Sequence, residues 1–541
     1  MKFDKDEQMS PLTQKVMGVY NFCGDKLCGL NKRIEAVHGR GPETVSLLLY
    51  IILYLAVSYV HEPGTGMMTA WNLAENYSFS EMIFELPGKC GAPPLYMLLL
   101  APFAKAGATT VVMAVFGLLF SGLAAALVLF LSPFPRALKL FLPFTYFMFY
   151  QYGIEGGIFS PLMLAAVLVA FAGKKRGKRP LVYMLAVLFL GLTSAAGAAL
   201  ALGLAIVWGY STWKKNSRFT KNILFSVAGV VLSAAILFWS WLAGGGFESG
   251  VDFAVKLLYL LFAAPADALV TNAFYGNGML PASGSVRISF LAEAAVLGAV
   301  LLALVFYFGR KKKTAGEFFV PYLSLVFFSM FRDVTRECSG LVFLLLLYWL
   351  WRTLEADSVP QEEKEHSKLW ERNHRALQST AALACTLALC ISLYWSVSAG
   401  VHDVHKEYEI GPAEAEFLRE SGLEKYRIMS DVSCFYMLEP HMKPYMDKDT
   451  GYLGHNVKTQ ENTDRWIKAG RPDVFFMDLD QEVLSWYEDV DGSDYVLVYL
   501  KAVETMWKAD TDYRGCAIYV RRSLASELGL EEITSIFPEK R

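Results

Sequence analysis

The chain has 541 residues, of which 54% are hydrophobic, and its apolar residues come in blocks that approach membrane-spanning length. This pattern excludes an ordinary soluble protein and predicts a polytopic α-helical membrane protein. The formal net charge of −2 shows no overall bias, and no basic tract is interleaved with aromatic residues, so nucleic acid is not expected as a partner.

The first element is a polar segment, residues 1–43, without the short apolar core and cleavage site of a signal peptide. Several Lys and Arg residues in it precede the first apolar run, residues 44–60. The positive-inside rule therefore predicts a cytoplasmic N-terminus and places Glu62 at the outer end of the first spanning helix.

The next apolar stretch, residues 93–108, is interrupted by Pro102 and is short for a span. If it crossed the membrane, the basic segment 173–180 would lie outside. If it is an outer-face or re-entrant helix, every dense Lys/Arg cluster lies inside. The second choice predicts about eleven transmembrane helices, with the N-terminus inside and the C-terminus outside. They are expected at residues 44–60, 109–132, 137–150, 158–173, 222–243, 288–308, 317–331, 338–351 and 379–398, with two more within 181–212.

These helices make up a predicted transmembrane domain of residues 44–398. Its outer loops are expected at residues 61–108, 151–157, 244–287 and 332–337. An amphipathic segment, residues 251–263, interrupts the third of these loops.

The remainder, residues 399–541, is charged and alternates a helix-like segment with strand-like runs, which predicts an extracytoplasmic α/β domain. The helix is expected at residues 411–422 and the strands at residues 426–432, 473–479, 495–500 and 516–522. Cys434 and Cys516 share this domain, and the sequence leaves open whether they form a disulfide or are two free thiols.

Few polar side chains can reach the outer membrane face, and two of the acids among them, Glu62 and Glu155, come from separate loops. A carboxylate can act as general base on an acceptor hydroxyl, and arginines can hold a phosphate through forked hydrogen bonds. We therefore take Glu62 and Glu155 as candidate catalytic residues. The candidate substrate-binding residues are His61, Lys89, Arg287, Arg332 and Arg336. The alternative is that these loop charges are simply solvated.

The order of three features near the start of the chain matches a known pattern. An acid follows the first span, a juxtamembrane segment Ala70–Ala74 contains Trp71, and Gly91–Tyr96 opens an apolar half-helix. This order resembles the bacterial GT-C glycosyltransferases, which are integral membrane enzymes that transfer sugars from polyprenyl-phosphate donors. The resemblance covers most of the chain and implies a GT-C-like fold and inverting transfer to a hydroxyl, with Glu62 in the place of the catalytic acid.

The resemblance also implies the partners. The donor would be a polyprenyl-phosphate sugar, and the acceptor would be a glycan, a lipid or a protein. The protein would lie in the cell membrane, in contact with membrane lipids. The resemblance also leaves open a divalent metal ion, Mg²⁺ or Mn²⁺, as a cofactor. The sequence itself shows no metal-ligand spacing, because no second His lies near His61.

The chain departs from the family pattern around its outer acids. His61 precedes Glu62 where an Asp is usual, Ala92 stands where a His is usual, no Arg follows Glu155, and Glu337 follows Arg336 where a His is usual. These departures keep two alternatives open. One is a catalytically degenerate GT-C-fold binding or scaffold protein. The other is a lipid or solute transporter, which would be expected to show paired broken helices in two matching halves.

Overall fold

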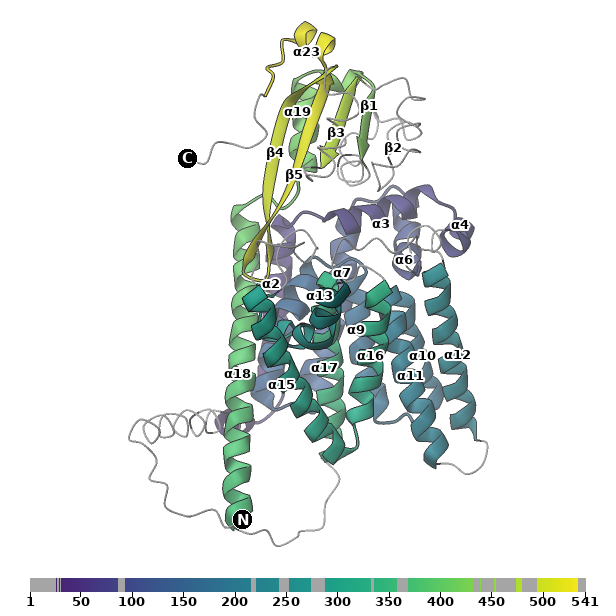
Figure 1. Ribbon diagram of the computed structural model, residues 1–541, viewed down its shortest axis with the longest axis vertical. Coiled ribbons are helices and arrows are strands. Elements are labelled where there is room, and N and C mark those ends of the chain that lie inside the picture. Colours follow the sequence, from purple (N-terminus) through teal and green to yellow (C-terminus); the bar gives the residue numbers. More distant parts are fainter. Residues whose placement is uncertain are drawn as a thin grey trace.

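The computed structural model consists of a large helical bundle with a small sheet at one end (Figure 1). It describes residues 26, 29, 31–85, 93–215, 220–242, 253–273, 288–331, 335–357, 368–431, 438, 452–453, 473–478 and 494–533.

Seven helices in the described part of the chain are long and apolar enough to cross a membrane. Large apolar side chains on their outer faces, such as Val45, Val231 and Val296, are more than half exposed, as expected of side chains that face lipid. The fold is therefore that of a polytopic helical membrane protein. The seven helices are α2 (Gly41–Val60), α7 (Val111–Leu131), α11 (Ala195–Lys215), α12 (Lys221–Leu242), α15 (Ile288–Lys312), α17 (Thr335–Asp357) and α18 (Lys368–His405).

Three shorter apolar helices complete the bundle: α9 (Phe159–Gly173), α10 (Pro180–Thr193) and α16 (Ala315–Phe331). The stretch 181–212 is divided into two helices as predicted, because Ser194 between α10 and α11 is extended, with φ −159° and ψ 163°. The division lies inside the run of small residues that suggested it.

The segment predicted not to cross the membrane forms the helix α6 (Leu95–Lys105). Its 11 residues span about 16 Å, roughly half of the hydrocarbon core. It packs on α3 (Thr65–Asn76) through buried Trp71 and Leu100. With α4 (Phe79–Phe84), these helices lie at the end of the bundle that faces the sheet (Figure 1).

The third predicted span is irregular. It begins with α8 (Arg136–Phe141) and the 3₁₀ turn η1 (Leu142–Phe144), and continues as a π-helix, η2 (Tyr146–Ile154), in which every residue is buried. The predicted outer loop 151–157 therefore starts too early, because its first four residues belong to η2. Aromatic packing explains the difference, since Tyr146 stacks on Tyr150 and Tyr152 packs against Phe147.

The described part of the predicted loop 244–287 is folded rather than extended. It consists of α13 (Phe253–Leu258), the π-helical η3 (Tyr259–Ala263) and α14 (Ala264–Asp267). Tyr259 and Leu260 are buried against the bundle. The approach to α15 is so close that a Cβ added at Gly298 would overlap the carbonyl oxygen of Phe262.

The C-terminal part contains a five-stranded sheet in the order β2-β1-β3-β5-β4. β1 (Ile428–Asp431) is parallel to β2 (Tyr452–Leu453) and to β3 (Val474–Asp478), whereas β5 (Asp510–Arg521) is antiparallel to β3 and to β4 (Tyr495–Trp507). The remaining elements are α19 (Gly411–Glu420), the turn η4 (Leu423–Lys425) and α23 (Arg522–Leu528).

The predicted helix and all four predicted strands are present, but the last two strands were predicted too short. They are the outer ends of one long hairpin, and the sequence did not suggest β2 at all. Cys516 is buried in β5, while Cys434 lies outside the described residues, so the choice between a disulfide and two free thiols stays open.

The tip of this hairpin enters the helical bundle (Figure 1). Trp507 packs edge-on against Tyr146 of η2. Lys508 is fully buried, and its Nζ donates to the carbonyl oxygens of Asp267 and Thr271 at 2.7 and 2.9 Å. The same ammonium group lies 4.8 Å from the centre of the Trp395 ring on α18, so the hairpin joins the sheet to the bundle through a buried cation.

Candidate functional site

Three segments that are far apart in the sequence meet at the end of the bundle beneath the sheet. They are the end of α2, the end of η2, and the end of α18 with the linker that leads to α19. Helix α2 stops before Pro63, since the residue preceding a proline is disfavoured in helical conformation, and His61 is already extended, with φ −78° and ψ 121°. The chain therefore turns across the end of the bundle at His61 and Glu62.

His61 is paired with Asp403, an acid in the last turn of α18. The distance between His61 Nδ1 and Asp403 Oδ2 is 2.7 Å, and the two side chains are 4% and 0% exposed. Tyr150 of η2 donates its hydroxyl to the Asp403 carboxylate, at 2.9 Å from each oxygen. Because a carboxylate only accepts hydrogen bonds, Nδ1 of His61 carries a proton. Within the described residues, His61 Nε2 is buried and has no hydrogen-bond partner.

Glu62 points toward the linker. Its Oε2 accepts a hydrogen bond from the backbone N–H of Glu409 at 2.9 Å. Burial raises the pKa of Glu62; the Glu409 N–H opposes this rise, and the neighbouring carboxylate of Glu407 adds to it. A carboxylate with a raised pKa is better matched to proton abstraction near neutral pH than an ordinary one.

Glu155 follows directly after η2, and the turn Gly156–Gly157, with φ of 53° and 61°, leads the chain into α9. Its Oε1 accepts a hydrogen bond from the hydroxyl of Tyr408 at 3.1 Å. The ring of Tyr408 also lies over His61, with the ring centres 4.1 Å apart. The structure therefore brings both predicted catalytic acids and His61 to one linker.

The other predicted site residues cannot be placed in this cluster. Lys89, Arg287 and Arg332 lie outside the described residues, and of Arg336 the structure describes only the backbone, in the first turn of α17. Phosphate binding by these four residues stays a prediction.

Sequence reasoning missed Asp403, Tyr150 and Tyr408. The last span was expected to end at residue 398, but α18 continues to His405, which places Asp403 on a membrane helix. An ionisable residue in such a position is itself a sign of a functional site, and this rule could have found Asp403. No sequence pattern pointed to Tyr408.

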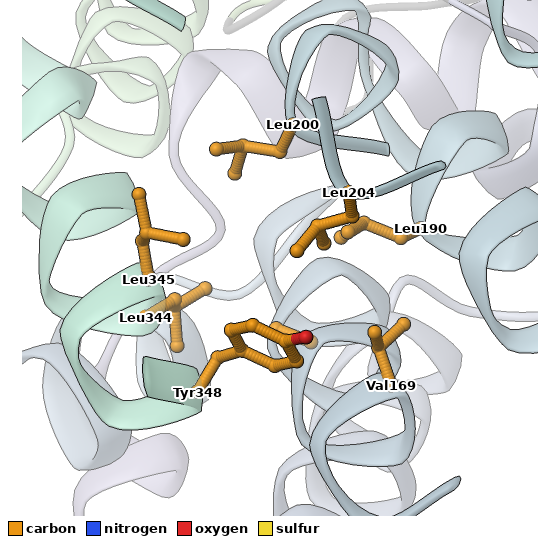
Figure 2. Close-up of a pocket in the computed structure, with 8 residues that line it drawn as sticks. Val169, Leu190, Leu200, Leu204, Leu344, Leu345 and Tyr348 are labelled. Atoms are coloured by element: carbon orange, nitrogen blue, oxygen red, sulfur yellow. The ribbon is translucent and has the colours of Figure 1, made fainter. Parts of the chain in front are cut away.

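Two further features bear on ligands. In the part of the chain that the structure describes, no group of three or more His, Cys, Asp or Glu side chains is arranged to hold a metal ion. A cavity between α9, α10, α11 and α17 is lined by apolar side chains and by Tyr348 (Figure 2). It offers about 10 Å³ to a water-sized sphere, which is near the minimum for one water molecule, so it cannot hold a sugar or a lipid.

The fold and the cluster define the class of the protein: a polytopic helical membrane protein with a small α/β domain seated over a group of buried ionisable residues. No protein-family model, curated protein or solved structure matches the chain.

Proposed function

We propose that the protein is a membrane glycosyltransferase that moves a sugar from a polyprenyl-phosphate donor to an acceptor hydroxyl, with inversion. The observation that supports this proposal is the convergence of Glu62 and Glu155, which come from separate segments, on two adjacent linker residues: Glu62 on Glu409 and Glu155 on Tyr408. The GT-C glycosyltransferases that the sequence resembles usually have an acid in each of two separate outer loops, and Glu62 and Glu155 stand at those places in this chain.

In the proposed reaction, the Glu62 carboxylate takes the proton of the acceptor hydroxyl. The resulting oxygen attacks the anomeric carbon from the face opposite the phosphate, the bond from that carbon to the phosphate oxygen breaks, and its electron pair leaves with the phosphate. Glu155 orients the acceptor. Arg336, with the other predicted cationic residues, binds the phosphate.

The proposed location is the outer face of the cell membrane. Basic residues cluster where α9, α11 and α15 end, as in Lys214–Lys215 and Arg310–Lys312, at the end of the bundle away from the sheet (Figure 1). The positive-inside rule assigns such an end to the cytoplasm, which would put Glu62 and the C-terminal domain outside.

Sugar transfer by purified protein in detergent tests the proposal. A panel of polyprenyl-phosphate sugars would be assayed with the wild type, Glu62→Gln and the matched control Glu85→Gln, an exposed acid of the same predicted loop. We expect transfer by the wild type and the control and a loss of at least about 100-fold in Glu62→Gln. A parallel assay with EDTA tests the dependence on Mg²⁺ or Mn²⁺.

The second candidate is a binding or scaffold protein of the same fold. It is favoured by the engagement of Glu62, Glu155 and His61 by residues of the chain itself. A wild type that binds the lipid phosphate but transfers no sugar from any donor would support this candidate and reject the enzyme.

A further inference from the structure

We propose that the end of α18 and its linker to α19, residues 403–409, form part of the active site, and that Asp403 and Tyr408 are positioning residues for His61 and Glu155. This inference rests on the proposed function, and it assigns roles to residues that sequence reasoning did not select.

The contacts match one to one. Each predicted site residue whose side chain the structure describes is held by a different group of this segment. His61 is held by the Asp403 carboxylate, Glu62 by the backbone N–H of Glu409, and Glu155 by the Tyr408 hydroxyl.

Asp403 determines which nitrogen of His61 is available. The carboxylate is fully buried and accepts hydrogen bonds from both His61 and Tyr150, as a buried charge requires. By holding the proton on Nδ1, it leaves Nε2 as the nitrogen that can bind a hydroxyl or exchange a proton. Tyr150 in turn fixes Asp403, so the ring orientation of His61 depends on η2 and α18 together.

Tyr408 links the other two groups. Its hydroxyl holds Glu155, while its ring covers the imidazole of His61. A change at Tyr408 therefore acts on Glu155 and His61 at once.

The C-terminal sheet holds this segment in place. Lys501 of β4 pairs with Glu407. Glu504 of β4 lies 3.7 Å from Lys406 and 3.8 Å from His402. Exposed pairs of this kind are weak individually, but the buried Lys508 at the hairpin tip fixes the same strand in the bundle. The position of the sheet is thus transmitted to the three site residues.

The test uses the full-length protein and four variants. Asp403→Asn and Tyr408→Phe each remove one positioning contact. Their matched controls are Asp494→Asn, at an exposed turn, and Tyr394→Phe, an exposed ring on α18. With a donor that the wild type accepts, we expect kcat to fall about 10- to 100-fold in the first pair, with KM within about threefold of the wild type, and both controls to keep wild-type values.

Two readouts do not need turnover. In protein labelled with ¹⁵N-histidine, the His61 resonance, assigned through His61→Gln, should report Nδ1 protonated in the wild type and a shift toward the Nε2-protonated tautomer in Asp403→Asn. Labelling of Glu155 by a water-soluble carbodiimide and an amine, read by mass spectrometry, should rise at least about threefold in Tyr408→Phe. If Asp403→Asn lowers the unfolding temperature strongly, Tyr150→Phe takes its place, because it removes only one bond to Asp403.

The outcomes separate this inference from the proposed function. If no donor is used, the enzyme proposal fails, while the tautomer and the labelling still decide whether Asp403 and Tyr408 position their partners. An unchanged His61 tautomer together with unchanged Glu155 labelling would overturn the inference. A loss of transfer in the two control variants as large as that in Asp403→Asn and Tyr408→Phe would also overturn the inference.

Discussion

Charged residues are buried in this protein where several polar partners surround them. Glu317, at the start of α16, lies 2.7 Å from Arg176 and 3.1 Å from Arg352 and accepts the hydroxyl of Tyr348. Asp403 and Lys508 follow the same rule at the other end of the bundle. A buried ion that loses one such partner still pays the cost of desolvation but no longer has the hydrogen bond or ion pair that offset this cost. Single substitutions at these sites should therefore lower the stability of the protein strongly.

Lys508→Met is predicted to destabilise the protein by about 2–3 kcal/mol, since it leaves a buried and a partly buried carbonyl oxygen without their charged donor. Thermal unfolding in detergent measures the effect. Lys501→Met is the matched control, because Lys501 pairs with a mostly exposed Glu407, and it should change stability by less than about 1 kcal/mol. Equal effects of the two substitutions would contradict the buried role of Lys508.

Glu62→Gln is predicted to affect stability in a pH-dependent way. Burial raises the pKa of Glu62 in the folded protein, so the folded state binds this proton more tightly than the unfolded chain. The stabilisation that comes from this tighter proton binding is fully present below the pKa of Glu62 in the unfolded chain, about 4.3. It is lost as the pH rises through the higher pKa of Glu62 in the folded protein. The neutral Gln avoids this loss.

Unfolding temperatures of the wild type and Glu62→Gln, measured between pH 4 and pH 8, check this prediction. We expect the two proteins to be alike near pH 4 and the variant to be the more stable near pH 8. A difference that grows toward acidic pH would refute the direction assigned to the Glu62 pKa.

At the scale of elements, the bundle depends on close contacts at glycines. A Cβ at Gly298 of α15 would overlap the backbone of η3, whereas a Cβ at Gly122 of α7 would meet, among the residues that the structure describes, only Leu118, at 3.9 Å. Small residues let helices approach closely in membranes, where packing rather than hydrophobicity drives association. These contacts explain why the predicted loop around η3 is part of the core.

Gly298→Ala is therefore predicted to destabilise the protein by about 1–3 kcal/mol through displacement of η3. The matched substitution Gly122→Ala should be neutral or stabilising by about 0.5–1 kcal/mol, because alanine favours the helix. Unfolding of both variants by denaturant or heat compares them directly. A neutral effect of Gly298→Ala would mean that η3 and α15 are not in such close contact.

At the scale of the whole molecule, the sheet, the linker and the end of α2 lie together at one end of the bundle (Figure 1). The proposed membrane orientation, with this end outside, rests on applying the positive-inside rule to the basic residues at the opposite end. The proposed chemistry therefore depends on an orientation that can be measured in intact cells.

Cysteine labelling with a membrane-impermeant maleimide tests this orientation. Ser526→Cys, at an exposed position in α23, should react in intact cells, above the background from the native cysteines of the wild type. Lys175→Cys, in the basic turn after α9, should react only after the membrane is permeabilised. The reverse pattern would move the candidate site to the cytoplasm and exclude the proposed location.

The sequence by itself determined the helical class, the short α6, the break near Ser194 and the approximate positions of the four main strands. These features depend on the lengths of apolar runs and on local periodicity, because lipid admits only backbones whose hydrogen bonds are satisfied internally. The sequence also selected His61, Glu62 and Glu155, as polar residues where few were expected.

Only the tertiary structure decided how these residues are combined. His61 and Asp403 are 342 positions apart, and no local pattern encodes which helix ends will become neighbours. Likewise, the hairpin was predicted too short because its tip lies in the bundle, where Trp507 and Lys508 are stabilised by partners from α18, η2 and the segment after η3. Burial against distant segments, rather than local propensity, sets the end of that hairpin and the geometry of the candidate site.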